Sequence, residues 1–213
     1  MALNKSKYMF FLITMLLLSL CGCAIGQNDI TRLENIPPVE PSVQRIRASF
    51  AYDPSSLQQE AGICDYVFVA TVVEDDGVEY RNTVVTEDEN GEVKEIGSPY
   101  SNYVLQVLEN WKGQLITDEE IPVVKHGGIS QDGSMLILFE DDQLPEVNKT
   151  YLFFGYAQKN GDILISGPNS NLELVDSQAR NSSGLYAQYK EAVDNEIVPV
   201  ERERYKSNYE QVD

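Results

Sequence analysis

Short runs of β-branched and aromatic residues, separated by Asx-Gly pairs, fill most of the chain between residues 66 and 175. The first run is Tyr66–Val73, and the most regular pair of runs flanks Asn160-Gly161. Asx-Gly pairs tolerate the positive φ angles of tight hairpin turns. The four such pairs are Asp76-Gly77, Asn90-Gly91, Asp132-Gly133 and Asn160-Gly161. Further strands are predicted at Tyr100–Leu108, Ile121–Lys125, Met135–Phe139, Tyr151–Tyr156, Ile163–Ile165 and Leu172–Val175. Eight or nine short strands without a long helix between them predict a mainly β domain, an antiparallel OB-like barrel or a sandwich.

Two helices are expected outside the strand region. Asp53-Pro54-Ser55 resembles a helix start, with Asp53 as the N-cap, and Gly62 would end this short N-terminal helix. A C-terminal amphipathic helix is predicted over residues 184–195, because Leu185, Tyr189 and Val193 recur with helical spacing. Residues 201–213 are polar and charged, which predicts a frayed second helix or a disordered end.

The N-terminus has the pattern of a lipoprotein signal peptide over residues 1–22. A 12-residue apolar run, Met9–Leu20, is interrupted only by Thr14 and Ser19. A membrane-spanning helix needs about 20 residues, so the run fits the core of an export signal better. Leu20 and Gly22 occupy the −3 and −1 positions of a bacterial lipobox before Cys23. We therefore expect Cys23 to carry acyl chains such as palmitate, which would hold the mature chain at the membrane. Cleavage without a lipid, or an uncleaved anchor, are the alternatives.

Residues 23–47 are predicted to be a lipidated, Pro-rich tether. Pro37, Pro38 and Pro41 favour an extended backbone there. The β domain is assigned to residues 48–176, and residues 177–213 to a helical, acidic and polar tail.

Charge and composition exclude several classes of function. The chain has 34 acidic and 16 basic residues, a formal net charge of −18. Nucleic-acid binding needs clustered Lys and Arg, so no nucleic-acid partner is expected. With one histidine and three cysteines, a zinc site would lack ligands. No metal and no cofactor are predicted, and the acidic clusters are interpreted as solvated turns.

The candidate binding residues lie in a loop and at one strand end: Trp111, His126, Gly127, Gly128 and Asp132. Gly-rich loops at the end of a β scaffold can vary without disturbing its core, which makes this loop the expected contact surface. No catalytic residue is assigned, because the single histidine has no nucleophile motif beside it. Cys64 is expected to be a small buried apolar residue.

Four segments carry a resemblance to known proteins: Asp65–Val72, Tyr103–Gly113, Val123–Gly128 and Lys149–Phe154. Their order is similar to that in a group of bacterial surface lipoproteins with a small β-barrel. It distantly resembles the OB-like barrel of metalloproteinase-inhibitor and netrin modules. The resemblance implies a fold and a cell-surface context. It does not imply protease inhibition, because the inhibitors act through a disulfide-bonded N-terminal cysteine segment that this chain lacks. The hairpin at Asn90-Gly91 would be an insertion between the first two core strands.

The sequence thus predicts a lipid-anchored, extracytoplasmic binding or structural module of a bacterial cell membrane. Its partners would be the membrane, through the N-terminal lipid, and a protein or other envelope component. A secreted hydrolase with paired carboxylates and a protease-inhibitor-like module are the alternatives.

Overall fold

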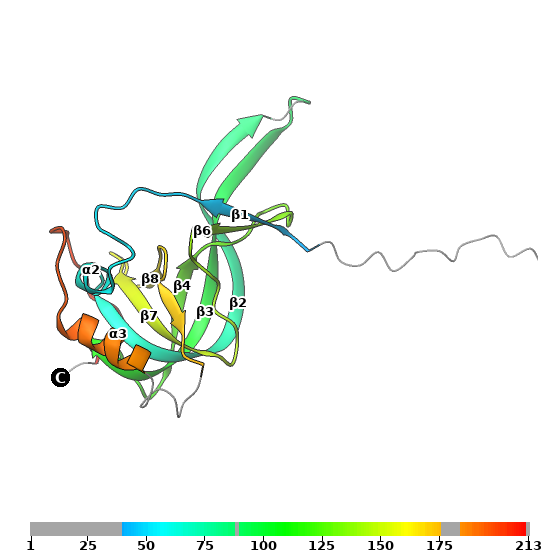
Figure 1. The fold of residues 1–213 in the computed structure, drawn as a ribbon. Helices are drawn as coiled ribbons and strands as arrows, with labels where there is room; N and C mark the ends of the chain where they lie inside the picture. The colour runs from blue at the N-terminus through cyan, green and yellow to red at the C-terminus, as the bar shows by residue number, and fades with distance from the viewer. Residues whose placement is uncertain (1–39, 88–89, 176–183, 212–213) are drawn as a thin grey trace, which may run out of the picture. The chain divides into compact units, whose positions relative to one another are not determined.

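The computed structural model describes residues 40–87, 90–175 and 184–211. The chain divides into two units at Glu40 and Pro41, and the described fold belongs to the second unit. The predicted signal peptide, Cys23 and most of the predicted tether lie outside the described residues. This unit is mainly β, as the sequence predicts (Figure 1).

The strands and helices occur in a simple order along the chain. They are β1 (Ser42–Ile46), α2 (Leu57–Ile63), β2 (Tyr66–Glu87), β3 (Val93–Lys112), β4 (Glu120–His126), β5 (Gly128–Ile129), β6 (Met135–Phe139), β7 (Thr150–Ala157), β8 (Ile163–Ile165), β9 (Asn171–Glu173) and α3 (Gly184–Asp194).

The larger sheet has the strand order β2-β3-β4-β8-β7-β9, and β7 also pairs with β2. The pairings therefore return to the strand at which they began. All are antiparallel except β4 with β8, which is parallel. A smaller sheet has the order β1-β6-β5, in which β1 and β6 are parallel. The prediction of purely antiparallel pairing is therefore wrong at two places. The parallel partners are not consecutive strands: β5, β6 and β7 lie between β4 and β8, and α2 to β5 lie between β1 and β6.

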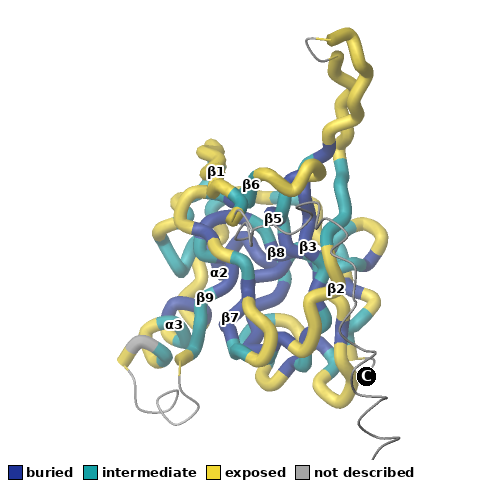
Figure 2. Tube along the Cα trace, turned by 90° about the vertical axis from the view of Figure 1, so that its right-hand side faces the viewer, coloured by how far each residue is buried: buried dark blue, intermediate teal, exposed yellow. Residues whose placement is uncertain are grey.

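Strand alternation divides the core into two clusters. On β2, Phe68 and Ala70 pack in one cluster with side chains of β3, β4, β7 and β8, while Val67 and Val69 pack in the other. The second cluster also contains residues of α2 and α3, so the two helices cover the face of β2 and β7 that points away from the first cluster. Figure 2 shows this buried centre in dark blue.

Strands β2 and β3 are much longer than predicted. They continue as a two-stranded hairpin beyond the rest of the sheet, and we call its residues 79–87 and 93–100 the arm (Figures 1 and 2). The Asn90-Gly91 turn lies at the end of the arm, so the hairpin extends the two core strands and is not an insertion between them. Asp76-Gly77 makes no turn, because the pairing of β2 with β3 continues past it through a register shift between Asp75 and Val78.

Two segments differ from the predicted boundaries. Residues 42–46 form β1, where a tether was predicted, because their backbone pairs with β6. Helix α2 is capped by Ser56, which accepts the Gln59 N–H, and not by Asp53. Asp53 closes a turn by accepting from the N–H and hydroxyl of Ser55.

The C-terminal tail follows an extended path across the domain after α3. The backbone N–H of Ser207 donates to the Tyr66 hydroxyl at 2.8 Å, and that hydroxyl donates to Glu210 at 2.6 Å. Tyr205 and Tyr209 pack against the first core cluster. The prediction of a second helix or a disordered end is therefore wrong for residues 201–211.

Candidate functional site

His126 lies at the end of β4, where it serves packing. Its ring stacks on Tyr100 at a centroid distance of 4.6 Å and meets the edge of Phe139 at 4.8 Å. Burial lowers the pKa of His126, and the positive charge of Lys125 lowers it further. The imidazole is therefore neutral at pH 7, with the Ser166 hydroxyl 3.4 Å from Nδ1.

The two glycines after His126 let the loop approach β3 and β6 closely. A Cβ on Gly127 would lie 2.9 Å from a Leu138 methyl, and one on Gly128 would lie 2.7 Å from the Ser101 hydroxyl. Both have positive φ, which favours glycine. Gly127 also donates its N–H to the Pro99 carbonyl at 3.0 Å, which ties the loop to the base of the arm.

Asp132 closes the turn between β5 and β6. One of its carboxylate oxygens accepts from the Ser130 hydroxyl at 2.6 Å and from the N–H and hydroxyl of Ser134 at 3.1 and 2.8 Å. These hydrogen bonds, that of Ser130 first, lower the pKa of Asp132 to about 2. The residue thus shapes the loop, and no cluster of metal-ligating side chains occurs among the described residues.

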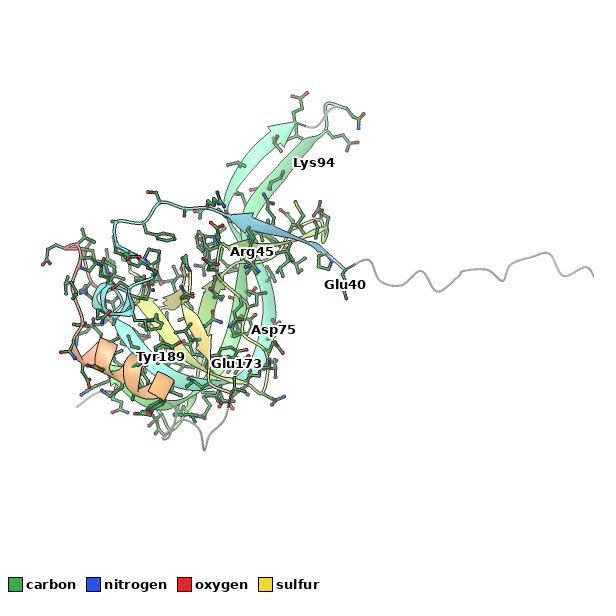
Figure 3. The ribbon with its side chains drawn as sticks, in the orientation of Figure 1. Glu40, Arg45, Asp75, Lys94, Glu173 and Tyr189 are labelled. Atoms are coloured by element: carbon green, nitrogen blue, oxygen red, sulfur yellow. The ribbon has the colours of Figure 1, made fainter. Side chains whose placement is uncertain are left out.

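The loop and the arm form one continuous surface. The Tyr80 hydroxyl donates to the Ile129 carbonyl at 3.1 Å, and the Arg81 guanidinium lies 4.8 Å from the centre of the Tyr100 ring. Arg81 also forms an ion pair with Glu79. Strand β1, with Arg45, crosses the molecule near the base of the arm (Figure 3). We call the loop 127–134 together with the arm the arm-end surface.

Trp111 does not belong to this surface. It lies 11 positions after Tyr100 on β3, which corresponds to roughly 35 Å along an extended strand. Its ring packs beside the second core cluster, with Tyr186 of α3 edge-on at 4.9 Å. Trp111 and the loop therefore cannot form one compact contact site.

A buried ion pair, which sequence reasoning missed, joins Lys125 to Asp142. Lys125 also donates to the Ser170 hydroxyl at 2.8 Å. Burial lowers the pKa of Lys125 and raises that of Asp142, and the attraction between the two charges opposes both shifts. The alternation Ile121, Val123, Lys125 is the signal that could have placed this lysine on the buried face.

Glu60 of α2 is a second buried carboxyl group. Its side chain is 0% exposed, and Oε2 has no hydrogen-bond partner in the described part of the chain. Burial raises the pKa of Glu60 to about 7. Asp142 and Glu60 thus both have the raised pKa that a general acid needs, but a substrate could reach neither, because solvent does not. These two carboxyl groups are therefore not placed to act on a substrate.

Cys64 follows α2 and is fully buried, and its thiol is free. Burial raises its pKa well above the ordinary value, which disfavours a reactive thiolate. The prediction that Cys64 is a small buried residue is confirmed.

In the described ranges, no helix has both the length and the apolar character needed to cross a membrane. No protein-family model and no curated protein matches this chain.

Proposed function

We propose that this protein is a lipid-anchored, extracytoplasmic binding module of a bacterial cell envelope, and that the arm-end surface is its contact site. The observation that supports the contact site is that the loop is held in place against the base of the arm. Tyr80, Gly127 and Gly128 fix the loop against a projecting hairpin whose side chains are largely exposed. A rigid base that presents an exposed loop and hairpin is suited to holding a partner.

We further propose that the larger sheet is a small OB-like barrel, as in the inhibitor and netrin modules that the sequence distantly resembles. The support is the cycle of pairings through β2, β3, β4, β8 and β7. The enclosed side chains, among them Phe68, Leu105 and Phe153, are all buried. A barrel of this kind keeps its core packing when an end loop changes in sequence, so the loop can vary to fit a partner.

The proposed anchor is Cys23, on the basis of Leu20, Gly22 and the short apolar run before them. Replacing Cys23 by Ala should move the protein out of the membrane fraction or leave the uncut precursor. Mass spectrometry of the mature N-terminus provides the direct measurement. An unmodified N-terminus at another residue would exclude this anchor.

The contact surface is tested by affinity capture from intact cells that carry the full chain. The exposed residues 131–134 are exchanged for an unrelated turn of equal length, with Gly127 to Ser130 retained. Partner capture should be lost while the melting temperature changes little. The matched control changes the exposed turn residues Asp118 and Glu119, at the other end of β3, and should capture normally. Capture that survives the loop exchange would place the contact elsewhere.

Substitutions of His126 and Cys64 distinguish the proposed binding role from an enzymatic role. Because both are packing residues, His126→Ala and Cys64→Ser should retain partner capture in any variant that still folds. Loss of function in His126→Ala at unchanged stability would support catalysis instead.

A further inference from the structure

Lys125 and Asp142 bring an amine and a carboxyl group into contact at a buried place. Nζ of Lys125, on β4, donates to Oδ2 of Asp142, in the loop after β6, and both side chains are 0% exposed. Two charges that have lost their hydration are often no more favourable than neutral groups of the same size. A reaction that removes both charges and keeps the contact would therefore relieve the cost of their burial.

The hydrogen bonds around this pair compensate only in part for its burial. Oδ1 of Asp142 has no hydrogen-bond partner in the described part of the chain. Nζ of Lys125 donates to Asp142 and, at 2.8 Å, to the Ser170 hydroxyl, whereas an ammonium group has three N–H donors. An amide nitrogen in the same position would keep one N–H, and the Ser170 hydroxyl is already placed to accept it.

Burial also favours the chemical forms of the two groups that can react. It lowers the pKa of Lys125 and raises that of Asp142, so proton transfer from the ammonium to the carboxylate costs less here than in water. That transfer produces a neutral amine, which is a nucleophile, and a carboxylic acid, whose carbon can be attacked. The ion pair is thus the starting state of a condensation.

We propose that Nζ of Lys125 and Cγ of Asp142 condense to an intramolecular amide, an isopeptide bond. One proton passes from the ammonium to the carboxylate, the neutral amine attacks Cγ, and the bond from Cγ to the hydroxyl oxygen breaks. The hydroxyl leaves with a second amine proton as water, so nothing is oxidised or reduced and no co-reactant is needed. Groups held in contact react as if at effective concentrations of about 10⁵–10⁸ M, and exclusion of solvent opposes the reverse hydrolysis.

The bond links two positions that are 17 residues apart. Residues 126–141 lie inside the ring that it closes, and they include the loop 127–134 of the arm-end surface. Both ends of the segment that carries this loop would then be joined covalently. The inference goes beyond the proposed function and does not depend on it, because the loop could hold a partner with or without the bond.

Peptide mass spectrometry of the purified, denatured full chain measures the bond directly. Trypsin cuts after Lys112, Lys125 and Lys149, and no other Lys or Arg lies between these positions. An unlinked chain therefore gives separate peptides 113–125 and 126–149. In a linked chain Lys125 is no longer a trypsin site, so a single peptide 113–149, lighter by the mass of one water molecule, should replace them.

A second cut verifies that the two side chains are joined. Met135 is the only methionine in residues 113–149, and cyanogen bromide cuts after it. An unlinked peptide that trypsin had merely failed to cut would separate into two parts. The linked peptide should stay one molecule, because the amide between Lys125 and Asp142 holds its parts together.

Lys190 and Asp194 provide the matched control within the same chain. They are the same two residue types, 2.5 Å apart, but their side chains are 38% and 57% exposed. Because water stabilises both charges there, this pair should stay unlinked and trypsin should cut after Lys190. The variant Lys125→Arg keeps the positive charge, but its guanidinium does not lose a proton in proteins, so it should show no water loss.

The wild-type measurement is decisive even if Lys125→Arg fails to fold, and circular dichroism verifies the fold of each sample. Separate peptides 113–125 and 126–149 at full mass from folded wild-type protein would overturn the inference. Water loss with normal cleavage after Lys125 would overturn it too, because a succinimide at Asp132-Gly133 loses the same mass. A bond from Lys125 to Glu60, the buried carboxyl group whose charge also acts on this lysine, would equally contradict it.

Discussion

The Lys125 ammonium donates to the Asp142 carboxylate, and both side chains are 0% exposed. This contact joins β4 to the loop that follows β6. Arg45 of β1 donates to the Asp142 backbone carbonyl from the other side. One aspartate thus connects the larger sheet, the loop and the smaller sheet.

Removing only one charge of this pair should be costly. Lys125→Met leaves Asp142 buried without its partner, and we expect a loss of about 3–5 kcal/mol in unfolding free energy. Urea denaturation measures the change. The double variant Lys125→Met, Asp142→Leu should recover most of it, because no buried charge is left alone. A double variant that is as unstable as the single one would mean that the ion pair itself stabilises the fold.

Glu60 should make stability depend on pH. Its folded pKa is about 7, against an ordinary value of 4.5, so the folded state binds the extra proton between these two values. Wild-type stability should therefore fall as pH rises from about 4.5 to about 7, by at most on the order of 3 kcal/mol, and then level off. Glu60→Gln should remove this contribution and be the more stable protein above pH 7. Equal pH slopes in the two proteins would show that Glu60 is not the titrating group.

Phe153 and Phe154 point to opposite faces of β7, and each is buried in its own cluster. Replacing either by Ala should cost about 3–5 kcal/mol in unfolding free energy, measured by thermal or chemical denaturation. Leu108, 47% exposed, provides the control, since its change to Ala should alter stability far less. A small effect at one phenylalanine would mean that its cluster contributes little to the fold.

Arg204 should hold the tail on the domain. It donates to the carbonyls of Gly62 and Cys64 at 2.6 and 2.8 Å and to Asp65 at 3.0 Å. Arg204→Ala should lower the unfolding free energy by about 1–3 kcal/mol and expose the tail to proteolysis. Lys206→Ala is the matched control: its side chain is 86% exposed, so little change is expected. Similar protease resistance in both variants would contradict a role for Arg204 in docking.

Much of the strand pattern follows from local sequence. Strand β6 occupies Met135–Phe139 as predicted, and α3 ends within one residue of its predicted end. The Asn90-Gly91, Asp132-Gly133 and Asn160-Gly161 turns also lie where expected, with a positive φ at each glycine. In these segments the alternation of side chains and the turn residues determine the local backbone over a few neighbouring positions. No distant contact is therefore needed to fix where these strands, helices and turns lie.

Other features depend on distant partners. Asp76-Gly77 has the same local signal as the true turns, but β3 pairs with both of its flanks and makes it a bulge. Strand β1 and the tail have few apolar residues, and their positions are set by β6 and by Tyr66, far away in sequence. Nothing within either segment encodes that choice of partner.

The candidate site was predictable only in part. His126, Gly127, Gly128 and Asp132 do share a loop. Trp111 lies at the end of β3, and antiparallel pairing of β3 with β4 places that end away from His126, so the grouping of Trp111 with the loop overlooked the strand direction. The arm was missed because the Asp76-Gly77 signal suggested that β2 ended early.

The link between Tyr66 and the tail means that the larger sheet is completed by residues far along the chain, Ser207 and Glu210 among them. Tyr66 begins the first strand of the larger sheet, and its hydroxyl partner Glu210 comes 144 positions later. During synthesis, the start of β2 must therefore wait for the 144 positions up to Glu210 before this contact can form. A chain interrupted before residue 205 would leave that hydroxyl and the apolar surface beneath Tyr205 and Tyr209 uncovered. A protease could then distinguish a chain that lacks residues 205–210 from one that carries them by this uncovered patch.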